Sequence, residues 1–395
     1  MVLLMLLVAT AYAVPPEIAN PHFGRDLVFE PNEANFKASL GGEFGASAVV
    51  DNTKTAGGGE ARIYSYFRLK GDLTHQLNPS DILGVQFEVI EPDSSLVELE
   101  DDRENRIRAR SYFYGPQFPT MKGYWRHTSE HQLWELGVGR DRFLGYDQLL
   151  GEYQGSMPPL LKYTQWWDNG VYLRHERYAG EKQLYSLQAS ILDSEGWVGM
   201  EDRWFSNSYF RFGAQGEIHI LHLLSLTNWG DLSLLGSWTN AEGGSASGGG
   251  RPGAKESFEH LLYGIQYSHN LWGLDFKTRF LSGEITCGKN HNNHEETVGW
   301  AWETLLGGFE CGKSFVDLCV SVSNAEYDGG EKFWLWKGSA THQDLFKFGI
   351  QVREAFGIEN LTIMGEYFKS DMDGHSSWRT LGEDDGVIFN LKYNF

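Results

Sequence analysis

The feature that most constrains this chain is a strict alternation of side chains over its last nine residues. Every second residue in this stretch is large and apolar, and most residues between them are polar. The apolar residues are Val387, Phe389, Leu391, Tyr393 and Phe395. Because successive side chains of a strand point to opposite faces, this pattern predicts a β-strand with one apolar and one polar face.

The same period-two alternation recurs along the chain and predicts about sixteen strands, an even number. The expected strands cover residues 35–48, 62–70, 82–90, 105–115, 132–140, 169–178, 183–192, 204–216, 231–239, 257–269, 272–283, 297–309, 314–323, 343–355, 360–369 and 386–395. Two segments, 116–131 and 217–230, are long for tight turns, so about eighteen strands is an alternative. The sequence therefore predicts an all-β fold.

The connectors between the expected strands alternate in length. Short links such as "NPSD", "YAGE" and "ECGK" are followed by long ones such as "NAEGGSASGGGRPGAKES" and "SDMDGHSSWRTLGEDD". Transmembrane barrels place tight periplasmic turns at one end and long extracellular loops at the other. The mean hydropathy of -0.39 fits such a barrel, because lumen-facing polar residues offset the lipid-facing apolar ones. We therefore expect a transmembrane antiparallel β-barrel.

Charge and hydropathy argue against several other classes of protein. After the N-terminus the longest apolar stretch is "IHILHLLSLTNW", which is interrupted by His219 and His222. It is shorter than the roughly 20 residues that a spanning helix needs. A net charge of -20 argues against a nucleic-acid partner. A secreted, soluble β-sandwich that binds carbohydrate through Trp and Tyr is an alternative.

The first residues predict export from the cytoplasm. The run "MVLLMLLVATAYA" is apolar and ends in the small-x-small pattern of a signal peptidase site. It is short and has no positive n-region, so we expect the true translation start to lie upstream. The expected organisation is a signal peptide over 1–13, an N-terminal periplasmic segment over 14–34 and one barrel over 35–395.

In its hairpin rhythm and its final strand ending on Phe395, the sequence resembles the porins of Gram-negative outer membranes. The resemblance implies that Tyr393 and Phe395 belong to the signal read by the barrel-insertion machinery. It also implies a homotrimer in the outer membrane, in contact with lipid and lipopolysaccharide. The Pro-Glu-Phe-Gly-Gly loop motif of enterobacterial general porins is absent, and the branch of the superfamily is not identified.

The third long connector, about 141–168, is similar to the loop that folds into the lumen of porins of this size and narrows it. It carries Asp141, Asp147 and Glu152. We expect these acids to face a basic wall, because opposed charges at a constriction are one way in which pores discriminate among solutes. An ordinary surface loop is the alternative.

Basic residues on the polar faces of two expected strands predict such a wall. An arginine facing lipid near the membrane midplane costs roughly 2 to 4 kcal/mol, so several at alternate positions are expected to point inward. The expected pore-lining residues are Arg62, Arg68, Lys70, Arg106, Arg108, Arg110, Tyr112 and Tyr114. The alternative places them at a rim, paired with the acidic "LEDDREN" loop or with lipid head groups. The wall predicts weak anion preference or weak selectivity.

Together these patterns predict a passive diffusion channel for small hydrophilic solutes that needs no cofactor. The alternative is a substrate-specific channel with a tyrosine track for an acidic or sugar solute, formed by Tyr64, Tyr66, Tyr112 and Tyr114. Catalysis is not expected, since no G-x-S-x-G nucleophile elbow occurs. The "HNNHEE" stretch is expected to be a solvated loop, because its histidines lack the H-E-x-x-H spacing, and no metal site is predicted.

Overall fold

The computed structural model describes most of the expected barrel. The described residues are 27–29, 36–51, 60–91, 100–101, 107–108, 117–142, 144–150, 158–162, 167–193, 210–245, 255–271, 273–289, 294–328, 339–375 and 383–395. The expected signal peptide lies outside these residues. Within the expected periplasmic segment, only β1 (Leu27–Phe29) is described.

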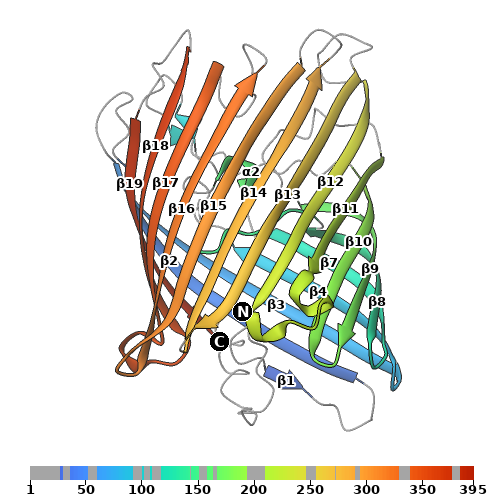
Figure 1. The fold of residues 1–395 in the computed structure, drawn as a ribbon. Helices are drawn as coiled ribbons and strands as arrows, with labels where there is room; N and C mark the ends of the chain where they lie inside the picture. The colour runs from blue at the N-terminus through green and yellow to red at the C-terminus, as the bar shows by residue number, and fades with distance from the viewer. Residues whose placement is uncertain are drawn as a thin grey trace.

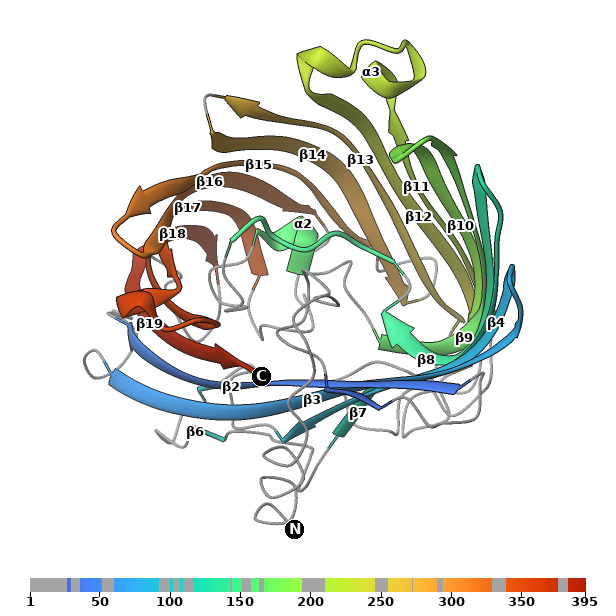
Figure 2. The same ribbon diagram turned by 90° about the horizontal axis from the view of Figure 1, so that it is seen from below.

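Sixteen long strands form one closed antiparallel ring (Figures 1 and 2). They are β2 (Phe36–Asp51), β3 (Glu60–Asn78), β4 (Asp81–Glu91), β7 (Gln117–Thr128), β8 (Gln132–Arg142), β9 (Trp167–Ala179), β10 (Lys182–Asp193), β11 (Phe210–His219), β12 (Asp231–Ser245), β13 (Lys255–Leu271), β14 (Leu274–Lys289), β15 (His294–Cys311), β16 (Ser314–Asp328), β17 (Ser339–Arg353), β18 (Leu361–His375) and β19 (Glu383–Asn394). Each strand pairs with its neighbours in sequence order. The predicted number of sixteen strands is confirmed. The alternative fold, a soluble β-sandwich, is wrong.

The ring closes where the last strand, β19, pairs with the first, β2. Their register runs from Gly386 opposite Asp51 to Asn394 opposite Glu43. Beyond it, Phe395 and Gly42 exchange two backbone hydrogen bonds of 3.0 Å. A β-carbon on Gly42 would collide with the ring of Phe395, so this position requires glycine. Closure removes the open sheet edge that would otherwise pair with another chain.

The first residues of β2 extend past the end of β19. There the short strand β1 pairs with β2, with Leu27 opposite Leu40 and Phe29 opposite Ala38. This pairing covers part of the edge that β19 leaves open, because β19 reaches only Glu43. The N-terminal segment thus continues the hydrogen-bonding of the seam.

The two faces of the ring differ in polarity, as the alternation predicts. Side chains on the outward face include large exposed apolar groups such as Val138, of which 60% is exposed, and Phe280. Inward positions on the same strands hold buried polar groups, including Glu135 on β8 and Arg279 on β14. A soluble protein does not leave so continuous an apolar belt in water, and this arrangement is that of a barrel surrounded by lipid.

The described connections at the lower end in Figure 1 are mostly tight, such as those at 79–80, 180–181 and 312–313. An exception joins β11 to β12 and holds α3 (Ile220–Leu223) and η3 (Thr227–Trp229). Another joins β17 to β18 through η4 (Ala355–Gly357). The segment 217–230 therefore contains no additional strand pair.

One expected wall strand, at 105–115, is wrong. In that segment only β6 (Ile107–Arg108) is described, and it pairs with β5 (Glu100–Asp101) in a separate two-stranded sheet. The wall strand after β4 is β7 instead. Its alternation is easily missed because its outward face includes Gly123 and its inward face includes the aromatic Tyr124. The expected and observed numbers agree because the expected strand at 105–115 occupies the place of β7 in the strand order.

No helix in the described parts of the chain has the length and apolar character needed to cross a membrane.

The outward belt gives a test of stability. Ile265 lies near the middle of β13, opposite the exposed side chains of Leu234 and Phe280. We expect Ile265→Arg to lower the free energy of unfolding in lipid vesicles by about 2–4 kcal/mol, since a lipid-facing arginine is desolvated there. Ile265→Leu is the control and should behave like the parent in a denaturant titration. An arginine variant as stable as the parent would mean that this face does not meet hydrocarbon.

Candidate functional site

The connection between β8 and β9 enters the ring of strands. Seen from below, its short helix α2 (Pro159–Lys162) lies within the ring (Figure 2). Leu160 and Leu161 on this helix are completely or almost completely buried. The helix lies against β14, β15 and β16, on the wall far from its own strands. The described residues 144–150 and 158–162, here called the inner loop, therefore reach across the lumen.

The start of the inner loop is fixed to the wall by packing and by one phenol. Leu144 packs in a buried cluster with Tyr172 and Leu192. The Tyr146 hydroxyl lies 2.9 Å from the carbonyl oxygen of Gly236 and 3.1 Å from that of Gly216, and its single hydrogen is shared between them. A side chain at Gly213 would collide with Leu144, so the wall leaves room for the loop.

The middle of the inner loop is bound by a buried arginine. Arg279 on β14 is 5% exposed, and its guanidinium donates to the backbone carbonyl of Asp147 and to the carboxylate of Glu303 on β15. Glu303 in turn accepts a 3.2 Å hydrogen bond from the backbone amide of Leu149. Buried charges are tolerated only when they are paired and hydrogen-bonded. The loop backbone supplies both a donor and an acceptor to this ion pair.

A buried lysine binds the next part of the loop in the same way. Lys347 on β17 donates to the side-chain oxygen of Gln148 and, at 2.8 Å, to the carbonyl oxygen of Leu150. The carboxylate of Glu366 lies 4.0 Å from its ammonium group. The Leu150 side chain packs with Cys319 and Met364. Two wall cations and an apolar contact therefore hold residues 147–150 in place.

The opposite wall carries a row of alternating charges that starts at the seam. Lys392 lies 2.8 Å from Glu43, and Arg68 lies 3.9 Å from Glu43 and 3.0 Å from Glu88. Lys70 lies 3.8 Å from Glu88. The residues come from β19, β2, β3 and β4, so the row crosses four adjacent strands.

The row continues across β7, β8 and β9. The Thr120 hydroxyl lies 3.3 Å from Glu88 and 3.2 Å from Asp141, and Lys122 pairs with Asp141. Farther along, Glu135 is held by Arg126 at 2.6 Å and by Arg174 at 3.1 Å. Glu135 also accepts a 2.6 Å hydrogen bond from the Tyr172 hydroxyl.

The charges of this row balance one another. Its six cations are Arg68, Lys70, Lys122, Arg126, Arg174 and Lys392. Five carboxylates pair with them, namely Glu43, Glu88, Glu135, Asp141 and Glu176, and a sixth, Asp72 on β3, accepts a hydrogen bond from the Tyr124 hydroxyl. The described row is therefore a neutral set of alternating charges, and of the expected basic wall it contains Arg68 and Lys70. Such a surface can orient dipolar solutes without strongly favouring one sign of ion.

The structure brings together only some of the predicted site residues. Arg68, Lys70 and Asp141 belong to the charged row, and Asp147 contributes its backbone carbonyl to Arg279. Residues for which no side chain is described are Arg62, Arg106, Arg108, Arg110, Tyr112, Tyr114 and Glu152. For these residues the pore-lining assignment stays a prediction.

The two residues of the expected insertion signal lie at the seam. Tyr393 pairs with Phe44 and is exposed on the outward face. Phe395 stacks on Phe67 with ring centroids 5.9 Å apart. Their role in membrane insertion stays a prediction.

The binding of the inner loop does not follow from the strand pattern. Arg279 and Lys347 lie on inward-facing positions, and a buried charge at such a position signals that a partner must come from elsewhere in the chain. A second group of side chains, at the short-turn end, also does not follow from that pattern. Among the described residues, His219, His222 and Asp231 form a cluster that could hold a metal ion.

No family model and no curated protein matches this chain. Solved structures do match it. The outer membrane channel DcaP of Acinetobacter baumannii matches with a TM-score of 0.57 and 12% identity, covering 93% of this chain and 100% of that one. The anion-selective porin from Comamonas acidovorans matches at 0.55 and 12%, covering 91% and 100%. OmpT of Vibrio cholerae in its trimer form matches at 0.54 and 10%, covering 92% and 100%.

The buried ion pair beneath the inner loop gives a second test of stability. We expect Glu303→Gln to lower the free energy of unfolding by about 3 kcal/mol, since it leaves the buried Arg279 without its carboxylate. The control is Asp344→Asn in the more exposed pair with His342, which should cost less than about 1 kcal/mol. Both are measured by denaturant unfolding followed by tryptophan fluorescence. If both variants lowered the free energy of unfolding equally, the buried Arg279–Glu303 pair would contribute no more to stability than the exposed pair does.

Proposed function

We propose that this chain, whose barrel has the fold of Gram-negative outer-membrane porins, lies in the outer membrane as a passive diffusion channel for small hydrophilic solutes. The observation that carries the proposal is the division between the two faces of one closed ring. Its outward face exposes apolar side chains, and its inward face holds paired charges and hydroxyl groups. A wet lumen inside an apolar belt is the arrangement of a channel.

We propose further that the inner loop is the constriction of this channel. The support is its position within the ring and its attachment to Arg279 and Lys347 on the wall opposite β8. The loop divides the cross-section between that wall and the charged row. Solutes would therefore pass along the row that includes Arg68, Glu88 and Lys122.

The channel is proposed to be weakly selective among ions. The charged row is balanced, and on the other wall Arg279, Lys347 and Arg353 each have a carboxylate within 4.0 Å. Of the two sequence-based expectations, weak anion preference and weak selectivity, these paired charges favour weak selectivity.

The proposed assembly is a homotrimer that contacts lipid and lipopolysaccharide, and its insertion would use the barrel-insertion machinery. OmpT of Vibrio cholerae, one of the similar structures, is described as a trimer form.

The first test is conductance in a planar bilayer. The purified protein should migrate differently on a gel before and after boiling and should insert with discrete conductance steps, in groups of three if trimers insert. In a salt gradient we expect a reversal potential near zero. Glu88→Gln should shift it toward anion selectivity, because both Arg68 and Lys70 lose a paired carboxylate.

The matched variant Arg68→Gln should shift the reversal potential in the opposite direction. A protein that gives no conductance steps would contradict the channel. Strong cation selectivity of the parent would contradict the balanced lumen while leaving the channel itself intact.

The second test removes the constriction. Deletion of residues 144–162 should raise the single-channel conductance severalfold, because water would replace the loop and hydrate Arg279 and Lys347. The control shortens the connector 246–254, which joins β12 to β13, and should leave the conductance unchanged. The gel shift on boiling reports whether each variant still forms a barrel. An unchanged conductance in a folded deletion variant would show that the inner loop does not narrow the pore.

A further inference from the structure

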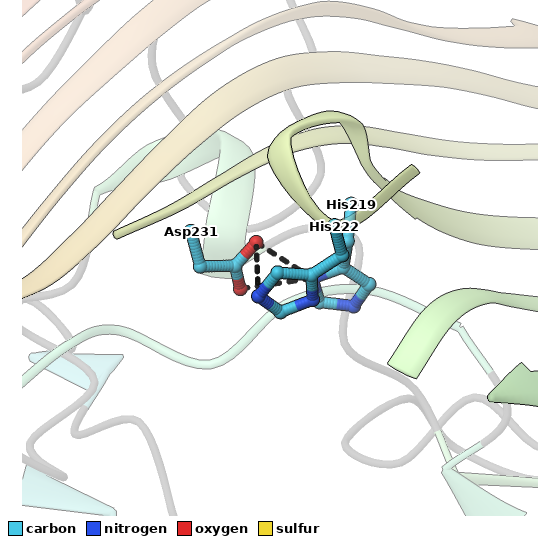
Figure 3. A group of neighbouring side chains, drawn as sticks. All are labelled: His219, His222 and Asp231. Carbon is cyan, nitrogen blue, oxygen red and sulfur yellow. Dashed lines mark hydrogen bonds and ion pairs between the residues drawn. The ribbon is translucent and has the colours of Figure 1, made fainter. Parts of the chain in front are cut away.

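The connection between β11 and β12 gathers two histidines and a carboxylate (Figure 3). His219 is the last residue of β11, His222 lies in α3, and Asp231 is the first residue of β12. The intervening helices return the chain so that the three side chains converge. His219 and Asp231 lie on the inward-facing positions of their strands. The helix α3 between them lies at the rim of the ring (Figure 2).

The donor atoms are already close to the spacing that a metal ion requires. The Nδ1 atom of His219 lies 2.8 Å from Oδ2 and 3.0 Å from Oδ1 of Asp231, and Nε2 of His222 lies 3.8 Å from Oδ1. One ligand atom from each residue lies within 4.8 Å of the others. Around tetrahedral zinc, with bonds of about 2.0 Å, neighbouring ligand atoms are about 3.3 Å apart. Small side-chain rotations would therefore bring these three ligand atoms to the spacing found around zinc.

A backbone contact fixes which nitrogen of His222 is available. Its Nδ1 lies 2.8 Å from the carbonyl oxygen of Gln183, to which it donates its hydrogen. In the neutral ring the opposite nitrogen, Nε2, then carries a lone pair and faces the Asp231 carboxylate, which is also an acceptor. A cation placed between these two acceptors would satisfy both. Metal-binding histidines commonly donate the other ring nitrogen to a carbonyl in this way.

The ring of His219 presents its Nδ1 to the cluster. The residue is 7% exposed; its Nδ1 contacts Asp231 and Ser233, whereas no group in the described part of the chain hydrogen-bonds to its Nε2. The nearest carboxylate to Nε2 is that of Glu217, at 4.0 Å, which is too far for a hydrogen bond. The Nε2 atom is on the other side of the ring from the Nδ1 that faces Asp231, so the metal position is argued from Nδ1 of His219 and Nε2 of His222.

We propose that His219, His222 and Asp231 bind a divalent transition-metal ion of the zinc class. Two imidazoles and one carboxylate suit zinc and its neighbours, whereas calcium and magnesium take oxygen ligands. Three protein ligands leave a fourth position for water or for Glu217. The ion would tie the end of β11 to the start of β12 and hold the α3–η3 connection against the rim.

The rival explanation is a purely structural His219–Asp231 ion pair that needs no metal. In that case His222 serves only as a donor to Gln183. A second rival site is the "HNNHEE" stretch, which contains His291 and His294. The experiment must separate binding at the cluster from both alternatives.

The test is a calorimetric titration of the full chain with zinc chloride. The protein is purified in detergent without a polyhistidine tag and stripped with a chelator. We expect one equivalent of zinc per chain and no binding of magnesium. His222→Gln keeps a donor for Gln183 but offers no imidazole, and it should weaken zinc binding by at least about tenfold. Asp231→Asn, which keeps an acceptor for His219, should do the same.

Two control variants locate the site. His131→Gln, an exposed histidine at another short turn, and the His291→Gln/His294→Gln pair should bind zinc like the parent. The gel shift on boiling verifies that each variant has folded. The proposal is overturned if the parent binds no zinc, if folded His222→Gln and Asp231→Asn bind like the parent, or if binding is lost in the His291/His294 variant.

Discussion

A polypeptide backbone in hydrocarbon must satisfy its own hydrogen bonds, and the rest of this structure depends on how the chain meets that requirement at one seam. The last strand, β19, pairs with β2, and Phe395 and Gly42 extend the pairing by two bonds. With the seam closed, an even number of antiparallel strands returns both ends of the ring to the same side. In the closed ring, each strand has one face toward lipid and the other toward the lumen.

Inside the ring, the wall and the inner loop depend on each other. Arg279 and Lys347 are charges on a wall that the loop covers, and the loop provides acceptors for both. The same loop would leave its own polar groups unsatisfied if those cations were absent. On the other wall, cations and carboxylates pair with one another from strand to strand. One wall therefore pairs its charges with the inner loop, and the other pairs its charges within the wall.

The period-two pattern was sufficient to predict a sixteen-stranded ring and most strand positions, because each wall strand has two chemically different faces. It failed at β7, where Gly123 faces outward and Tyr124 inward, and favoured a segment near Ile107 instead. It could identify Arg68 and Lys70 as inward-facing, but not their pairing with Glu88 on the next strand. The loop contacts join residues 132 and 197 positions apart, a separation that local patterns do not encode.

The atoms that the inner loop offers to the wall have a consequence for how such a channel can diversify. Arg279 binds the carbonyl oxygen of Asp147, and Lys347 binds that of Leu150, so two acceptors come from the backbone. A backbone carbonyl is present whatever side chain the residue carries. The hydrogen bond from Arg279 therefore does not depend on which side chain stands at position 147. These two contacts between the barrel wall and the inner loop can therefore persist when the loop sequence changes.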